Sequence, residues 1–94
     1  MNGFTEEIDV VAVHGQQVVA VAEAKWTARP LGTSVLRSLI DHKLPALSQA
    51  GFEVAGCSIV LASKSGFSSG ARELAGQSSQ VRLLDAHDLL LGLR

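Results

Sequence analysis

Two carboxylates and one ammonium lie at the outer ends of two apolar segments that follow one another in this 94-residue chain. Asp9 lies at the start of the first segment, and Glu23 and Lys25 lie at the end of the second. We expect strands over residues 8–13 and 17–25, and a hairpin between them brings the three polar side chains to one end. Placing these charges together on an apolar sheet costs free energy unless a metal ion or ion pairing offsets them. The pattern is therefore typical of a metal-dependent phosphodiesterase site.

The length of the hairpin loop decides whether the three side chains share a face. Glu23 and Lys25 do so because side chains alternate along a strand. A loop with an odd number of residues, three (14–16) or five, puts Asp9 on that face too. A loop of two or four would turn Asp9 to the other face, since a slip of one residue reverses every side chain. Gly15 suits an odd loop with one left-handed residue, so we expect that loop.

Both expected strands are apolar on both faces. The acid-bearing face carries Val11, Val13, Val19 and Val21, and the other face carries Ile8, Val10, Val18, Ala20 and Ala22. Strands that lack polar alternation are typical of α/β proteins, in which helices cover both sides of the sheet.

The remaining pattern predicts alternating helices and strands. Thr33 or Ser34 can cap a first helix, which kinks or restarts at Pro45 and stops at Gly51. The later elements are expected as a strand over 54–62, a helix over 68–75, a strand over 81–84 and a last helical turn or two, capped by Asp85 and ending at Leu91. The predicted fold class is α/β, in the order β-β-α-β-α-β-α, within a single domain spanning residues 1–94.

Composition narrows the class of protein further. The chain is 47% hydrophobic, which is enough for one core, and its net charge of -1 gives no bulk attraction to nucleic acid. The lone Cys57 lies in an apolar segment and is expected to be a packed thiol in a reducing compartment. Because we find neither a membrane-crossing run nor a signal-peptide pattern, we expect a cytoplasmic protein.

On these residues the chain resembles the PD-(D/E)XK nuclease superfamily, and within it the Mrr-like restriction endonucleases. The strings Glu7-Ile8-Asp9-Val10-Val11-Ala12 and Glu23-Ala24-Lys25-Trp26 are also similar to a domain of unknown function at the C-terminus of prokaryotic P-loop ATPases. Segments 66–75 and 81–90 resemble the C-terminal half of the Mrr-type core. The resemblance implies a restriction-endonuclease-like mixed β-sheet flanked by helices, in a domain that forms the C-terminal part of a longer protein, plausibly an ATPase.

The resemblance also implies a function for each site residue. Asp9, Glu23 and the backbone carbonyl of Ala24 would hold Mg²⁺ or Mn²⁺, a hard cation that prefers oxygen ligands. The metal would acidify a water and neutralise charge while a DNA phosphodiester is cleaved. Lys25 would orient or deprotonate that water and stabilise the developing charge. The expected function is thus a Mg²⁺-dependent DNA endonuclease.

The alternative is a catalytically inactive module for regulation or protein interaction, in which Lys25 merely pairs with Glu23 or Asp9. The resembled families usually carry a helix before the first motif, and none is predicted in this chain. We therefore expect either a homodimer, a partner such as an N-terminal ATPase domain, or an exposed apolar patch.

Other candidate residues carry weaker signals. Trp26 is expected to pack under the first helix. The three histidines share no ligand spacing and are expected to be structural or exposed: His14, His42 and His87. Four basic residues could contact phosphates, but isolated basic residues are usually solvated and are expected at the surface: Arg29, Arg37, Lys43 and Lys64. Ser63-Lys64-Ser65-Gly66 lacks the upstream glycine of a phosphate-binding P-loop, so the chain is not itself an NTPase.

Overall fold

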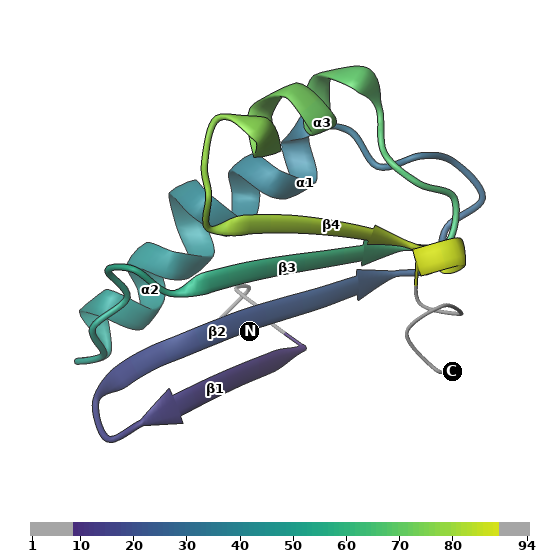
Figure 1. The fold of residues 1–94 in the computed structure, drawn as a ribbon. Helices are drawn as coiled ribbons and strands as arrows, with labels where there is room; N and C mark the ends of the chain where they lie inside the picture. Colours follow the sequence, from purple (N-terminus) through teal and green to yellow (C-terminus); the bar gives the residue numbers. More distant parts are fainter. Residues whose placement is uncertain (1–8, 89–94) are drawn as a thin grey trace, which may run out of the picture.

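The computed structural model describes residues 9–88, which form one mixed four-stranded sheet in the order β1-β2-β3-β4 (Figure 1). β1 is antiparallel to β2, whereas β2, β3 and β4 run parallel. The strands are β1 (Val10–His14), β2 (Gln17–Lys25), β3 (Ser58–Ser63) and β4 (Val81–Asp85), and the helices are α1 (Thr33–Ser38), η1 (Leu39–Lys43), α2 (Leu44–Gln49) and α3 (Ser69–Gly76). The predicted α/β class, with a mixed sheet flanked by helices, is confirmed. None of the described helices is long and apolar enough to cross a membrane.

The first predicted helix is one continuous helical segment with a widened turn in its middle. The π-helical turn η1 lies between α1 and α2 and ends at Lys43, two residues before Pro45. Pro45 has no N–H to donate to the carbonyl four residues back, and its ring crowds that carbonyl. Leu44 N–H accordingly donates to Leu39 O, five residues back. The predicted kink at Pro45 is thus accommodated by a π-turn.

The ends of the helices follow from local chemistry, with one correction. Gly51 adopts φ +101 after α2, and Phe52 N–H donates to Leu47 O at 3.1 Å, which is the Schellman arrangement expected of a terminating glycine. Ser68 Oγ accepts from Ala71 N at 3.1 Å and caps α3. The predicted cap of α1 is wrong, because neither Thr33 nor Ser34 caps it: the N-cap is Gly32, without a side-chain hydrogen bond.

The third strand is shorter than the apolar run predicted. Residues 54–57 precede β3 in a turn, in which Gly56 adopts φ +77 and Cys57 N–H donates to Val54 O at 3.2 Å. Hydrophobicity alone could not distinguish this apolar turn, in which Ala55 and Gly56 are exposed, from a strand. Cys57 is 1% exposed, and burial raises the pKa of its thiol, as expected for a packed cysteine.

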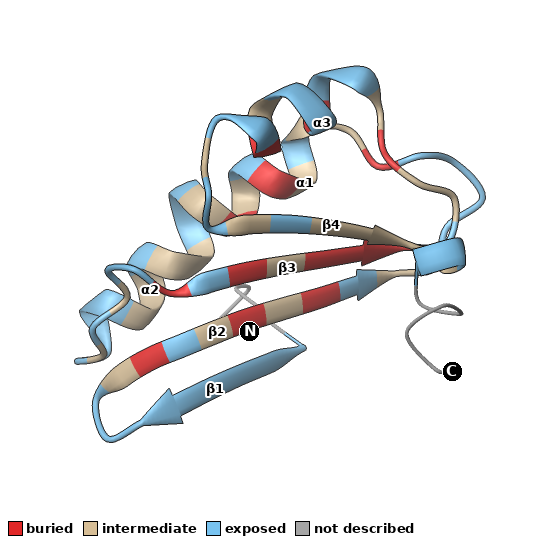
Figure 2. Ribbon diagram, in the orientation of Figure 1, coloured by how far each residue is buried: buried red, intermediate tan, exposed pale blue. Residues whose placement is uncertain are grey.

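All described helices lie on one side of the sheet, which leaves the other side open in residues 9–88 (Figure 1). The fully buried residues Leu36 and Leu39 of the helical layer pack with Val21 and Leu61 of the central strands. Figure 2 shows this burial along β2 and β3, while every residue of β1 is exposed. The expectation of helices on both sides is therefore not met by the described residues.

We call the uncovered side the open face. Alternation and the strand register assign to it Val10, Ala12, Ala20, Ala22, Ala24, Val60, Ala62 and Leu84, with Ser58 and Arg82 as polar members. It is thus a largely apolar surface of small side chains.

Candidate functional site

The hairpin places Asp9 on the same face as Glu23, as predicted, but with a different loop length and a β-bulge. His14 pairs with Gln17, so the loop has two residues, Gly15 and Gln16, and the predicted odd loop is wrong. Such a loop alone would turn Asp9 to the face opposite Glu23. A β-bulge between Ala12 and Val13 shifts the register by one residue and reverses that outcome.

The bulge also corrects the predicted faces of β2. Val13 pairs with Val18 and Ala12 with Ala20, which leaves Val19 as the extra residue. Val18 is fully buried and Val19 is 52% exposed, contrary to the expectation that Val19 shares the acid-bearing face. Beyond the bulge Val11 pairs with Val21, and continuing that register sets Asp9 opposite Glu23. Asp9, Glu23 and Lys25 therefore hold positions on one face at one end of the hairpin.

Glu23 is a buried carboxylate that two ammonium groups compensate. It is 4% exposed and lies beside Leu61 of β3. Lys43 Nζ donates to both of its oxygens, Oε1 at 2.9 Å and Oε2 at 3.0 Å. Lys25 Nζ lies 3.6 Å from Oε1, and its side chain is 40% exposed. Lys43 is the close partner of Glu23, whereas Lys25 keeps its ammonium near solvent.

Lys43 was not identified from the sequence as a site residue, and it was expected at the surface. Its side chain is only 14% exposed, because Leu39 lies one helical turn before it and both face the sheet. The signal available in the sequence was this spacing, seven residues after Leu36 and four after Leu39, both of which are buried. A buried carboxylate such as Glu23 needs a cation at close range, and the helical layer supplies it.

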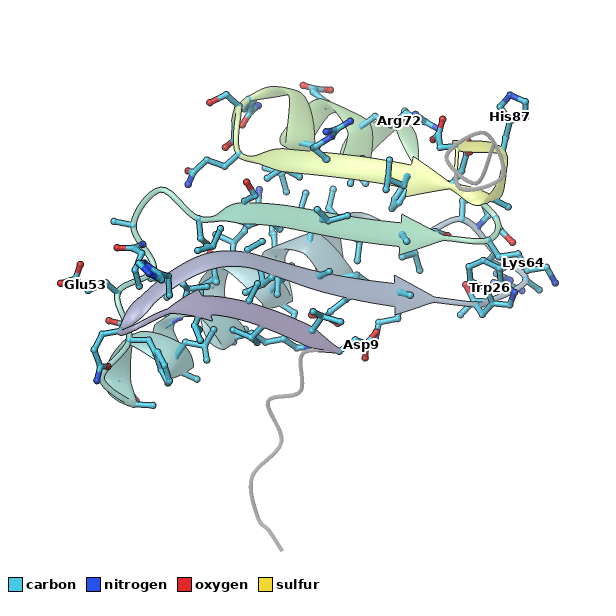
Figure 3. The ribbon with its side chains drawn as sticks, turned by 60° about the horizontal axis from the view of Figure 1, so that its bottom comes forward. Asp9, Trp26, Glu53, Lys64, Arg72 and His87 are labelled. Carbon is cyan, nitrogen blue, oxygen red and sulfur yellow. The ribbon has the colours of Figure 1, made fainter. Side chains whose placement is uncertain are left out.

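Asp9 is exposed, and its side chain bonds to the backbone of β2 just beyond the last paired residues of β1 and β2. Its Oδ2 accepts a hydrogen bond from Ala24 N at 2.8 Å. Figure 3 shows Asp9 at the start of β1, near the end of the sheet where β2, β3 and β4 terminate. One carboxylate oxygen of Asp9 thus stabilises the backbone of the Glu-x-Lys segment directly.

The oxygen atoms of the candidate site are of the kind that binds Mg²⁺, but the ammonium of Lys43 already bonds to Glu23. Asp9 and Glu23 provide carboxylates and Ala24 a carbonyl, and Mg²⁺ typically takes one or two protein carboxylates and keeps its waters. Residues 9–88 contain no group of three or more histidine, cysteine or acidic side chains that could hold a metal ion. For a metal to bind Glu23, the ammonium of Lys43 has to give up at least one of its two bonds.

A second group of polar side chains lies at the same end of the sheet, after β3 and β4. A cavity of about 340 Å³ is lined by Lys64, Ser65, Gly66, Phe67, Arg72, Asp85, Ala86 and His87.

Asp85 Oδ1 accepts from Asp88 N at 2.8 Å and Asp88 Oδ2 from Asp85 N at 3.0 Å, a reciprocal cap of the turn that follows β4. The Asp88 N–H lowers the pKa of Asp85. The cap that was predicted at Asp85 is therefore present; Leu91, its predicted end, lies outside the described residues.

Trp26 contradicts its predicted position. It is 62% exposed at the end of β2, rather than packed under the first helix (Figure 3). Trp26 directly follows β2, at the start of the segment that connects the sheet to α1. The expectation for the three histidines is confirmed, since all three are exposed: His14, His42 and His87.

Comparison of the chain with models of known protein families, with curated proteins and with solved structures finds no match. Its function therefore has to be inferred from the residues and their geometry.

Proposed function

We propose that this domain has a restriction-endonuclease-like fold of the PD-(D/E)XK type and acts as a Mg²⁺-dependent DNA endonuclease. The observation that carries the proposal is the hairpin register, in which a bulge sets Asp9 opposite Glu23 with Lys25 on the same face. The mixed sheet supports it, since β2 lies between an antiparallel and a parallel neighbour and ends in the Glu-x-Lys segment.

Each site residue has a specific task in this proposal. Asp9, Glu23 and the Ala24 carbonyl would hold the metal, which when bound acidifies a water and neutralises phosphate charge. Lys25, two-fifths exposed, reaches solvent and would orient that water and stabilise charge on the phosphate. Lys43 compensates the buried charge of Glu23.

Metal binding tests the proposal most directly. We expect Mn²⁺ to bind the chain in titration calorimetry, and Asp9→Asn or Glu23→Gln to abolish that binding because each removes a charged ligand. Glu53→Gln is the matched control, since Glu53 is exposed at the opposite end of the sheet (Figure 3). Lys25→Ala should keep metal binding and lower DNA cleavage about a hundredfold or more. Equal Mn²⁺ binding in the wild type and both carboxylate variants would refute the metal site.

The second candidate is a catalytically inactive interaction module, such as a domain appended to an ATPase. The bond of Lys43 to both oxygens of Glu23 favours it, because this ion pair satisfies the buried carboxylate without a metal. Lys43→Ala separates the two candidates. In a nuclease it should strengthen Mn²⁺ binding, because a competing cation is removed. If neither the wild type nor Lys43→Ala binds Mn²⁺, the inactive module is the better description.

A further inference from the structure

We infer that the end of the sheet where β2, β3 and β4 terminate binds single-stranded nucleic acid, with Trp26 stacking on an unpaired base and Lys64 and Arg72 contacting phosphates. The inference that single-stranded nucleic acid is the substrate rests on the proposed nuclease function. Binding of the strand itself is measured without metal.

The first observation is the exposed indole. Among the large hydrophobic residues within 9–88, Trp26 is the most exposed, at 62% compared with 57% for Val10. An indole with an accessible face at the end of a strand loses the free energy that burial would supply. Successive bases of single strands stack on such aromatic side chains, and stacking accepts any base.

The second observation is that a basic residue is fixed beside the indole. Lys64 N donates to Lys25 O at 3.2 Å, and Ser65 Oγ donates to Thr27 O at 2.6 Å. These bonds hold the segment after β3 against the segment that contains Trp26. Figure 3 shows Trp26 and Lys64 together at this end of the sheet.

The third observation is the cavity on the other side of Lys64. Lys64, Arg72 and His87 all line its 340 Å³, which accommodates a phosphate group. The Arg72 guanidinium lies 6.0 Å from the centre of the Phe67 ring, which holds it at the cavity wall. Asp85 is the one acidic lining residue, and its Oδ1 is already engaged by Asp88 N.

These features favour an unpaired strand over a duplex. Lys64 is bonded to the segment next to Trp26 and also lines the cavity, so a base contact at Trp26 adjoins phosphate contacts at Lys64 and Arg72, an arrangement that suits a single strand. A duplex offers phosphates to Lys64 and Arg72 but keeps its bases stacked on one another, which leaves Trp26 without a partner. The net charge of -1 adds no general attraction, so contacts at this surface have to supply the preference.

The fluorescence of Trp26 is a direct readout, because it is the only tryptophan in the chain and the chain has no tyrosine. With EDTA present and at low salt, oligodeoxythymidylate of about ten nucleotides should quench that fluorescence saturably. Neither a duplex of equal length nor inorganic phosphate should quench it. Lys64→Ala and Arg72→Ala should each weaken the affinity several-fold, and more at low salt than at high salt. Arg37→Ala, which lines a different cavity on α1 and α3, should leave it unchanged.

Trp26→Leu tests the stacking itself. With a dye-labelled oligonucleotide and anisotropy as the readout, this variant should bind about tenfold or more weakly. Its circular dichroism should match the wild type because Trp26 is exposed. Absence of quenching, equal affinity for the duplex, or unchanged binding by Trp26→Leu would each overturn the inference. EDTA makes the outcome independent of the metal site: a chain that binds the single strand but no Mn²⁺ retains this surface and loses only the nuclease proposal.

Discussion

At the scale of single residues, the buried charge of Glu23 depends on compensation by a cation at close range. A carboxylate that is 4% exposed is tolerated because Lys43 donates to both of its oxygens, while Lys25 adds a longer and more solvated contact. Removing one partner of a buried pair leaves the other uncompensated, which costs more than the pair itself contributes. Stability at this position should therefore depend on Lys43 and little on Lys25.

Urea denaturation of two matched variants checks this dependence. Lys43→Met should lower the free energy of unfolding by about 3 kcal/mol, because Glu23 stays buried without its close partner. Lys25→Met should lower it by less than about 1 kcal/mol, as is usual for exposed ion pairs. Glu23→Gln in the Lys43→Met background should restore part of the loss. Equal losses in the two lysine variants would contradict the assignment of Lys43 as the main counter-ion.

At the scale of elements, the turn after β4 depends on a reciprocal pair of backbone caps. Asp85 and Asp88 each accept the other's amide hydrogen. The hydrogen bond from Asp88 N–H to Asp85 Oδ1 favours the ionised form of Asp85 in the folded state, which is why its pKa lies below the ordinary value of 3.8. A depressed folded pKa means that the stabilisation is present above pH 3.8 and declines as the pH falls below it.

Asp85→Asn should remove the pH dependence of stability that arises from the Asp85 carboxylate. The amide oxygen of asparagine still accepts the Asp88 N–H but carries no charge to lose. Thermal unfolding followed from pH 7 down to about 3 should show the wild type losing its advantage over Asp85→Asn as the pH passes below 3.8. A constant difference between the two proteins across the series would show that the charge of Asp85 does not contribute.

At the scale of the whole molecule, the described residues leave one face of the sheet uncovered, and β1 forms one of its two edges. β1 is an edge strand with all five residues exposed, among them Val10 at 57% and Val13 at 49%. It contains neither proline nor a lysine, glutamate or aspartate, the residues by which edge strands usually avoid pairing with other chains. Its composition favours association with a second copy through an antiparallel, two-fold symmetric contact between the β1 strands.

Sedimentation should therefore show reversible self-association that increases with concentration. Val10→Lys should shift the equilibrium to the monomer, because a charge on the edge and on the open face opposes pairing. Trp26→Lys makes the same kind of change at an exposed apolar residue outside β1 and should leave the association intact. A wild-type chain that is monomeric at every concentration would show that β1 does not pair with a second copy.

The sequence by itself determined the elements whose signals are local. β2 spans residues 17–25 both in the prediction and in the structure, because its apolar run is continuous and is bounded by polar residues and a turn. The helix stop at Gly51 and the helix start near Ser68 were equally local, since each depends on hydrogen bonds within a few residues. The strand after Gly51 was predicted too long, because the turn over residues 54–57 is as apolar as the strand that follows it.

Only the tertiary structure decided the register and the counter-ion of the candidate site. The correct placement of Asp9 was predicted from an odd loop, whereas the chain uses a two-residue loop and a bulge at Val19. Val18 and Val21 are both fully buried, and the bulge is what lets residues three apart on one strand face the same helical layer. Lys43 meets Glu23 only because that layer packs on β2, twenty residues away along the chain. Local periodicity carries no information about such contacts, because packing between distant segments selects them.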